Sequence, residues 1–384
     1  MFDKKIIFCV VFIMSKLNLV IADSDEEYLN GVIGFLSEKH LERFKILSFS
    51  DKESLMNFIS TYTEKLDILL ISPELYFEEI SKKGITLVGI LSTGRLSKEY
   101  RGSEIIHKYQ LGENLVKNII NLYSDKSSDI IITKGQKETK VVAVYSSNGG
   151  SGKTTISYGC SLKSVQHGRT AFYMNLEESA STPVLFGTGG QYNLSHVLYY
   201  LKSRNKSLSL KIEGIKITDQ DTGVHYFNPP VNHLELLDIE PSEYFNLINH
   251  MKEMNQYEVI YVDMPCFIEK RMMAVLDASD TIFYILNPNQ ISKVKLHNFL
   301  SELDILDKSY KQKILSKTVF ILNKAFNEEQ GLEIFSDILG SIEKNISHTL
   351  PESSKLSTFQ NGRIVLDLAG KFGSALDDVV ERHI

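Results

Sequence analysis

The amino-acid sequence predicts an α/β protein with mainly parallel sheets, divided into two domains. Short apolar runs rich in β-branched residues alternate with amphipathic helical stretches along most of the chain, as in proteins built from βα units. A polar segment, residues 125–139, interrupts this alternation, and the apolar run after it leads into a glycine-rich loop and a further helix. At 384 residues the chain is too long for one average core, so two domains are expected.

Composition and charge limit what the protein binds. Hydrophobic residues make up 43% and charged residues 23% of the chain, as in soluble globular proteins. The formal net charge of -6 gives no general attraction to nucleic acid or anionic lipid, and no local basic patch stands out. The final stretch, residues 374–384, carries three acids and one arginine, unlike a membrane-binding helix. We therefore expect no nucleic-acid partner and no direct membrane insertion.

Two further features indicate a cytoplasmic protein. The three cysteines are odd in number and far apart, which argues against a disulfide framework, and Cys266 is expected to be a small buried hydrophobe. The apolar run from Ile6 to Met14 is too short to span a bilayer and lacks a signal-peptide cleavage site. Because Met14 begins a sequence typical of a natural N-terminus, residues 1–13 are interpreted as an extension from an upstream start. The alternative is a bound signal or membrane anchor.

The first domain, residues 14–124, is expected to be a (βα)₅ unit with a parallel sheet. Its predicted strands each precede a predicted helix and cover residues 17–21, 44–49, 68–71, 85–91 and 105–107.

Polar residues at the ends of these strands make the domain similar to a response-regulator receiver. Asp23 and Asp25 stand where the receiver's acidic Mg²⁺ pair sits, Ser92 where its switch hydroxyl sits, and Lys108 where its lysine sits. The resemblance implies a phosphoacceptor aspartate at the position of Ser72, and a serine cannot form the acyl phosphate. We expect a pseudo-receiver used for docking or dimer contacts. The two acids have the alternative role of capping the first helix.

A phosphate-binding loop opens the second domain, residues 140–384, after the linker at residues 125–139. The stretch Lys140 to Thr155 reads KVVAVYSSNGGSGKTT, which is a strand, a glycine-rich loop and the start of a helix. Glycines let backbone N–H groups turn toward a phosphate chain, a lysine adds a charge, and the helix N-terminus adds its dipole. The residues expected to bind the nucleotide here are Asn148, Gly149, Gly150, Ser151, Gly152, Lys153, Thr154 and Thr155, with the hydroxyl of Thr154 on Mg²⁺.

The glycine spacing distinguishes two kinds of phosphate loop. A standard Walker A loop needs glycine at position 147, where this chain has Ser147. The adjacent Gly149 and Gly150 resemble the deviant loop of MinD/ParA-type ATPases, whose signature lysine falls here on Asn148. In that family the lysine reaches across an ATP-sandwich dimer to the partner's phosphates. The resemblance therefore implies an ATP-dependent homodimer in which hydrolysis is slow and binding is retained.

Two later strand ends supply further acidic positions. The strand predicted at residues 169–174 ends in Asn175-Leu176-Glu177, where the MinD/ParA pattern has D-x-D at its first switch. Glu177 keeps a carboxylate that can orient water or the metal shell. Asn175 cannot act as a base. It occupies the switch position or simply caps the end of the strand, and the two interpretations are equally supported. The strand at residues 257–263 ends in Asp263, the arrangement of a Walker B aspartate that holds Mg²⁺.

These residues give a predicted catalytic set of Lys153, Glu177 and Asp263, with Thr154 and Asp263 at the metal. Asn323, after a strand at residues 318–322, resembles the family's adenine reader, and Pro351 lies in a turn that resembles the one beside the base. Residues 178–240 contain a predicted helix at 194–201 and a hairpin formed by residues 210–218 and 224–227, with no catalytic constellation.

Phosphate loop, first switch, Walker B aspartate and base reader occur in this order over about 230 residues. We therefore expect a doubly wound P-loop NTPase domain resembling the MinD/ParA type, with ATP and Mg²⁺ as cofactors. The receiver-like domain in front of it and the altered lysine resemble the CpaE/TadZ proteins of tight-adherence pilus systems. That resemblance implies a cytoplasmic positional marker whose N-terminal domain binds pilus or secretion assembly proteins, which would give it a place at the cell pole or near the membrane.

Two alternatives come from other functional classes. A ParA-like partitioning ATPase needs Lys/Arg clusters for DNA, whereas residues 326–384 hold five Lys/Arg and ten Asp/Glu. An uncharacterised P-loop enzyme needs an additional acid/base pair or cofactor motif, and the sequence contains no such motif.

Overall fold

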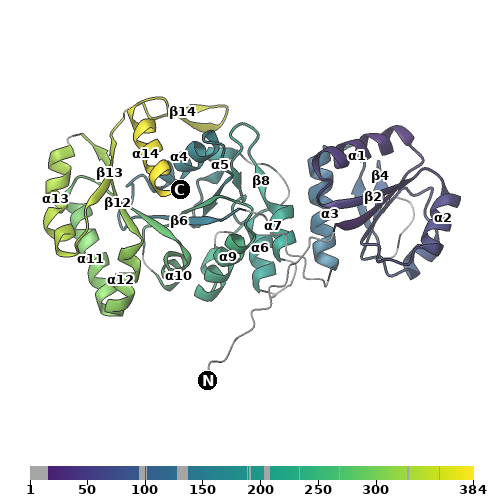
Figure 1. The fold of residues 1–384 in the computed structure, drawn as a ribbon, viewed down its shortest axis with the longest axis horizontal. Coiled ribbons are helices and arrows are strands. Elements are labelled where there is room, and N and C mark those ends of the chain that lie inside the picture. The colour runs from purple at the N-terminus through teal and green to yellow at the C-terminus, as the bar shows by residue number, and fades with distance from the viewer. Residues whose placement is uncertain are drawn as a thin grey trace, which may run out of the picture. The chain divides into compact units, whose positions relative to one another are not determined.

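The computed structural model describes residues 16–94, 100, 102–127, 137–187, 189, 192–202, 208–232, 234–267, 269–326, 328–353 and 355–384. Their contacts divide the chain into two compact units (Figure 1). The first consists of the described parts of Met1–Thr133 and Lys206–Gly214, and the second of those of Lys134–Asn205 and Ile215–Ile384. The predicted extension at residues 1–13 and most of the predicted linker lie outside the described residues.

Five parallel strands form the sheet of the first unit, in the order β2-β1-β3-β4-β5. The strands are β1 (Leu17–Ala22), β2 (Phe44–Phe49), β3 (Ile68–Ile71), β4 (Leu87–Ser92) and β5 (Glu104–His107), which confirms the predicted strands to within two residues. The helices are α1 (Glu26–Lys39), α2 (Lys52–Thr61), the 3₁₀ helix η1 (Glu78–Lys82) and α3 (Gly112–Lys126).

The prediction of a helix after every strand of this unit is wrong after β3. That connection forms only the 3₁₀ helix η1 and is interrupted by Pro73 and Gly84. The helix predicted after β4 falls mainly on residues 95–99, which lie outside the described residues. The sheet is nevertheless covered on both faces, with α1 and α3 packed against Leu19 and Ile21, and α2 against Val20.

Residues 208–218 differ from the predicted hairpin strand. They form helix α7 (Leu208–Ile215), followed by the two-residue strand β8 (Ile217–Thr218), which pairs with β9 (His225–Tyr226). The alternation of apolar and polar residues in LSLKIEGI imitates a half-buried strand. In the structure the whole helix is buried, and its polar side chains have partners: Glu213 pairs with Arg43 at 2.8 Å and Lys211 with Asp125 at 2.9 Å.

The second unit is built on an eight-stranded sheet in the order β13-β12-β11-β6-β10-β7-β9-β8, parallel except at β8. Helices lie on both faces (Figure 1). The remaining strands are β6 (Lys140–Tyr145), β7 (Ala171–Asn175), β10 (Val259–Asp263), β11 (Thr281–Leu286), β12 (Thr318–Ala325) and β13 (Ile346–Pro351), and a separate hairpin joins β14 (Ser357–Gln360) to β15 (Arg363–Leu366).

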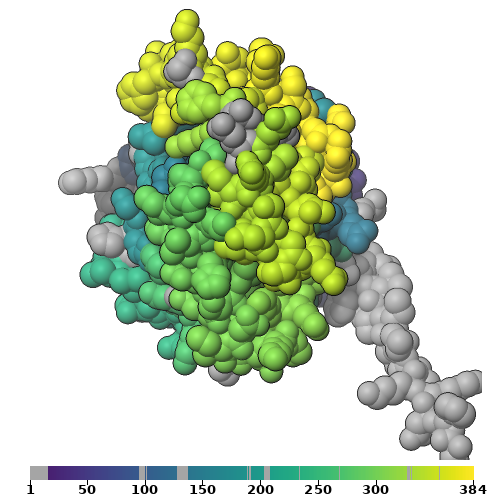
Figure 2. Space-filling model, turned by 90° about the vertical axis from the view of Figure 1, so that its left-hand side faces the viewer, coloured from purple at the N-terminus to yellow at the C-terminus, as the bar shows by residue number. Residues whose placement is uncertain are grey.

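The helices of this unit vary in length from four to seventeen residues. They are α4 (Lys153–Gln166), α5 (Thr182–Phe186), α6 (Leu194–Lys202), α8 (Leu234–Leu237), α9 (Pro241–Glu253), α10 (Lys270–Ala278), α11 (Gln290–Leu306), α12 (Lys308–Ser316), α13 (Glu328–Ser341) and α14 (Lys371–His383). Figure 2 shows a face formed by the later elements, coloured green to yellow. None of the described helices combines the length and apolar character needed to cross a membrane.

Helix α4 lies between the sheet and α14. Its residues Ile156 and Cys160 belong to the same buried cluster as Val142 of β6 and Leu376 of α14. A side chain at Gly159 would collide with Leu376, so the glycine permits this close packing. The N-terminus of α4 is thereby held rigidly at the carboxyl edge of the sheet.

Candidate nucleotide-binding site

The predicted site residues meet at the carboxyl edge of the second sheet. Strand β10 lies between β6 and β7, and its last residue, Asp263, is in register with Val144 and Asn175. The loop after β6 therefore begins beside the Walker B aspartate and the first switch. A crevice at the carboxyl ends of parallel strands is the general location of ligand sites in such sheets.

Glycines shape the loop between β6 and α4. Gly150 and Gly152 have φ angles of 69° and 96°, a left-handed conformation that side chains strongly disfavour. The hydroxyl of Ser146 donates to the carbonyl of Ile285 at 2.7 Å and accepts from the N–H of Asn148 at 3.1 Å. The loop is thus anchored to β11 at one end and enters α4 at the other.

Lys153 is the first residue of α4 and is only 6% exposed. The charge of Lys153 acts on the carboxylates of Glu177 and Asp263, and the buried hydroxyl of Ser151 has no hydrogen-bond partner among the described residues. A buried cation at a helix N-terminus is stable when an anion joins it, because both the charge and the helix dipole favour negative groups there. These residues fit the phosphates of a nucleotide.

Asp263 is fully buried, and its two oxygens have different surroundings. Oδ2 accepts a hydrogen bond from the hydroxyl of Tyr173 at 2.8 Å, whereas Oδ1 has no partner among the described residues. Burial and the nearby Glu177 raise the pKa of Asp263 to about 7, partly offset by Tyr173, Thr154 and Lys153. An orphaned carboxylate oxygen beside a threonine hydroxyl is an oxygen donor set that Mg²⁺ prefers, so Thr154 and Asp263 fit the metal predicted there.

Mg²⁺ binding is expected to weaken as the pH falls below 7. The raised pKa means that Asp263 is mostly protonated below about 7, and the cation must then displace a proton, which costs about tenfold in affinity per pH unit. Above about 7 the affinity should level off. Calorimetry of Mg²⁺-dependent nucleotide binding at pH 6 and pH 8 measures this difference, and Asp263→Asn, which has no titrating group at this position, should lack it.

Asn175 acts as a cap at the end of β7. Its Oδ1 accepts from the N–H of Glu177 at 2.8 Å, while its amide donates to the hydroxyls of Tyr173 at 3.1 Å and Ser181 at 3.3 Å. Of the two roles considered from the sequence, the geometry favours the cap. Burial raises the pKa of Glu177, partly offset by the charge of Lys153. The Glu177 carboxylate thus lies within the electrostatic reach of the phosphate loop.

Three asparagines hold the far side of the loop. Asn323 donates to the carbonyl of Ser151 at 2.8 Å, and Asn287 donates to the same oxygen at 3.4 Å. Asn148, at the signature-lysine position, donates to Oδ1 of Asn287 at 3.1 Å. The Asn323 amide therefore contacts the loop itself in this structure, and its base-reading role stays a prediction. Pro351, at the end of β13, lies in register with Ala325 near this edge.

Sequence reasoning missed two residues of the site and misjudged a third. Asn287 directly follows the apolar run TIFYIL that forms β11, so the rule that polar residues at strand ends converge could have identified it. Tyr173 lies inside a strand and gave no such signal. Cys266, predicted to be buried, is exposed, because it lies beyond the end of β10 in the connection to α10.

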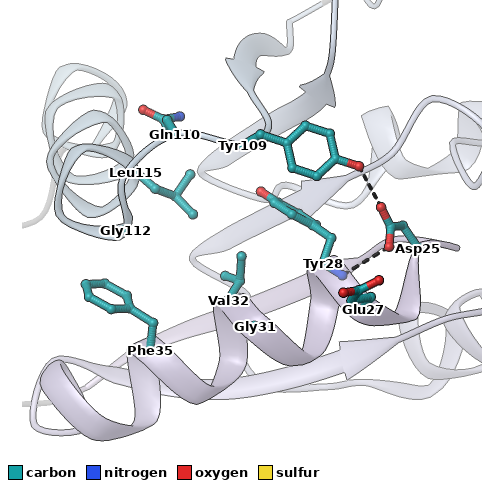
Figure 3. A pocket seen from close by; sticks show the side chains of 10 residues that line it. All are labelled: Asp25, Glu27, Tyr28, Gly31, Val32, Phe35, Tyr109, Gln110, Gly112 and Leu115. Carbon is teal, nitrogen blue, oxygen red and sulfur yellow. Dashed lines mark hydrogen bonds between the residues drawn. The ribbon is translucent and has the colours of Figure 1, made fainter.

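In the first unit, an ion pair holds the receiver-like acids. Lys108 Nζ lies 2.9 Å from Oδ2 of Asp23, and Asp25 caps α1 by accepting from the N–H of Tyr28 at 3.0 Å. Asp25 also accepts from the hydroxyl of Tyr109 at 2.7 Å (Figure 3). Among the described residues, no group of three or more His, Cys, Asp or Glu forms a candidate metal site here or elsewhere.

The pocket in Figure 3 lies beside these acids and has a volume of about 500 Å³. Its walls come from α1, from the connection after β5 and from the start of α3. It is lined by Asp25, Glu27, Tyr28, Gly31, Val32, Phe35, Tyr109, Gln110, Gly112 and Leu115.

Ser72, at the phosphoacceptor position, is 1% exposed, and its hydroxyl has no partner among the described residues. Its N–H donates to the carbonyl of Ala22 at 2.8 Å, which fixes the backbone at the end of β3. A buried hydroxyl of this kind is a poor nucleophile, because neither a base nor a metal activates it.

The second unit has the α/β arrangement of P-loop NTPases, with a glycine loop, an N-terminal lysine of the following helix and a strand-end aspartate. Structural comparison matches the septum site-determining protein MinD of Pyrococcus horikoshii, complexed with Mg-ADP, at a TM-score of 0.50 and 18% identity over 64% of this chain and 95% of that one. A ParA family ATPase of Chlorobium tepidum matches at 0.52 and 18% over 63% and 98%. MinD of Aquifex aeolicus matches at 0.50 and 20% over 63% and 95%.

The chain therefore has a MinD/ParA-type P-loop ATPase fold over about 63% of its length, with an additional α/β unit. No protein-family model and no curated protein sequence matches the chain. At identities of 18–20%, the likeness concerns the fold.

Proposed function

We propose that the protein binds Mg·ATP at the carboxyl edge of the second sheet and acts as a nucleotide-controlled positioning or assembly factor. One observation carries the nucleotide part. A buried carboxylate oxygen without a partner among the described residues, Oδ1 of Asp263, lies at the end of β10, and the glycine loop that starts from the neighbouring strand β6 leads to the largely buried Lys153 at the start of α4. A bound phosphate and cation would satisfy both groups.

The roles of the residues follow from their positions. Lys153 and the backbone of residues 149–152 would hold the phosphates, and Thr154 and Asp263 the metal, which when bound neutralises phosphate charge. Glu177 would orient water. Tyr173 keeps the Asp263 carboxylate in place through Oδ2 and leaves Oδ1 for the metal. Asn323 and Pro351 would lie at the base.

Calorimetric titration of the full chain with ATP, with and without Mg²⁺, tests this proposal. A single site that requires Mg²⁺ for full affinity is expected, and the variant Asp263→Asn should lose the Mg²⁺ dependence while keeping residual ATP binding through Lys153. Equal affinity with and without the metal would contradict the placement of Mg²⁺. No binding at all would overturn the proposed function.

Slow turnover and an ATP-dependent homodimer are the second part of the proposal. They are supported by Asn148, which occupies the signature-lysine position and contacts Asn287 in its own chain. A neutral amide cannot neutralise charge on a partner's phosphates, so the ATP-bound state should persist. Long persistence suits a stationary marker in the cytoplasm better than a rapidly cycling motor.

We further propose that the first unit is a pseudo-receiver that binds partner proteins, such as those of a tight-adherence pilus or secretion assembly. The support is the strand order and the ion pair that occupies Asp23. Neighbouring genes for a secretion ATPase and prepilins would strengthen the pilus assignment. Neighbouring partition genes would favour the alternative of a DNA-binding partitioning ATPase.

Phosphodonors are expected to leave the first unit unmodified. Ser72 replaces the acceptor aspartate and its hydroxyl is buried, so an acyl phosphate cannot form there. Incubation with acetyl phosphate and Mg²⁺ followed by intact-mass measurement should show no adduct. A stable phosphoryl addition that disappears in Ser72→Ala would refute this prediction.

A further inference from the structure

Helix α7 belongs to the first unit although its sequence lies inside the second. The chain leaves the second unit after Asn205 and returns at Ile215. Leu210 is part of the first unit's hydrophobic core together with Tyr123 of α3. This helix is therefore built into the first unit and does not merely touch it.

Polar contacts fix α7 in one position. Asn121 of α3, which is fully buried, donates to the carbonyl of Gly214 at 2.9 Å, and a side chain at Gly214 would collide with it. Glu213, whose side chain is 2% exposed, pairs with Arg43. Buried polar groups with matched partners specify a single arrangement, because any shift leaves a group unsatisfied.

From the C-terminus of α7, a short route leads to the candidate metal ligand. Only Lys216 separates Ile215 from β8, where Ile217 is in register with Tyr226 of β9. Tyr226 is in turn in register with Tyr173 of β7. The Tyr173 hydroxyl donates to Asp263.

The strands on this route are packed and not loosely connected. The rings of Tyr226 and Phe186 stack at a centroid distance of 4.4 Å, and Phe186 also contacts Tyr173 at 5.5 Å. All three side chains are almost completely buried. Packed interiors transmit displacements because they have no free volume to absorb them.

We infer that α7 couples the nucleotide state of the second unit to the first unit. The inference rests on the proposed function, since it takes Asp263 as a ligand of the metal that accompanies ATP. A cation bound at Oδ1 would draw the Asp263 carboxylate toward it, and the Tyr173 hydroxyl, which donates to Oδ2, would follow. The resulting adjustment of β7 reaches β9, β8 and, through one residue, α7. By linkage, a partner that binds the first unit through surfaces adjoining α7 alters the affinity for Mg·ATP by the same factor.

Hydrogen exchange of the full chain, with and without Mg·ATP, measures the effect of the nucleotide on α7. Exchange at the amides of α7 and of α3 around Asn121 is expected to change about fivefold or more, the lower end of typical coupling between sites. An insertion of two glycines between Lys216 and Ile217 leaves the contacts of α7 and the nucleotide site in place but loosens the connection. In that variant the response of α7 should disappear while Mg·ATP still binds.

Calorimetry measures the effect of α7 on nucleotide binding. Glu213→Gln weakens the docking of α7 and is expected to change the Mg·ATP affinity about fivefold. The control Glu64→Gln removes the exposed pair of Glu64 with Lys45 in the same unit and should have no effect. Circular dichroism would show whether Glu213→Gln unfolds the unit. If it does, the hydrogen-exchange response of the glycine insertion tests the coupling instead.

The outcomes separate the coupling from the proposed function. Binding of Mg·ATP by the unaltered chain with no change in exchange at α7 overturns the coupling alone. A response of α7 that survives the glycine insertion also overturns it. Absence of Mg·ATP binding overturns the proposed function together with the coupling.

Discussion

Lys153→Ala is expected to lower the affinity for Mg·ATP by roughly tenfold to more than a hundredfold. Lys153 is the charged residue that α4 places at the phosphate loop, and 6% of its surface is exposed. A charge-assisted contact of this kind contributes about 1.5–3 kcal/mol when its partner is otherwise left unpaired, which corresponds to that range in the dissociation constant. Calorimetric titration of the variant beside the unaltered chain measures the loss.

A matched control lies on the same helix. Lys163 is buried at the opposite end of α4 and pairs with Asp377 at 2.8 Å, away from the loop. Lys163→Ala should keep the nucleotide affinity, although it removes an ion pair. Unchanged affinity in Lys153→Ala would count against the whole site.

Asn148→Lys is expected to raise the rate of ATP hydrolysis from a very low starting value. Stabilisation of transition-state charge by an inserted cation is worth about 10³ to 10⁵ in rate where an arginine finger supplies it. The unaltered chain has an amide at this position, held by Asn287. Lysine has a longer side chain with a positive charge, which in the proposed dimer would reach the phosphates of a second chain. Turnover assays together with sedimentation in ATP and in ADP test both claims.

Asn148→Ala separates the two changes that Asn148→Lys makes. Alanine loses the hydrogen bond to Asn287 without adding a charge, so its turnover should stay low. Equal acceleration by alanine and lysine would show that the loop contact, and not the missing cation, limits the rate. Fast hydrolysis by the unaltered chain, or a mass that does not depend on the nucleotide, would refute the slow ATP-dimer proposal.

The local elements of the site could be predicted from the sequence because they depend on neighbouring residues. The strand from Lys140, the loop glycines and the strand ending in Asp263 all appear where periodicity and turn chemistry placed them. The contacts between strands could not be predicted, because they depend on register. Tyr173 reaches Asp263 only because β7 and β10 are in register at Asn175.

Helix α7 shows a different limit of sequence reasoning. Its alternating pattern is correct for a strand whose one face is solvated. The prediction of a strand at residues 210–218 was wrong because the polar residues Lys211 and Glu213 are buried with partners distant in sequence. Arg43 lies 170 positions before its partner, so no local window contains both.

The first unit is assembled from two separate segments of the chain, and this determines when it can form during synthesis. Ribosomes release the N-terminal part of a chain first, and domains generally fold as units once their residues are available. Here the core that contains Leu210 and the pair of Arg43 with Glu213 needs residues made long after α3. Until residue 214 has emerged, the nascent first unit carries an uncovered apolar surface, and Asn121 lacks the Gly214 carbonyl that accepts its hydrogen bond in the complete chain. The first unit is thus completed only after β6, α4 and β7 of the second have been made.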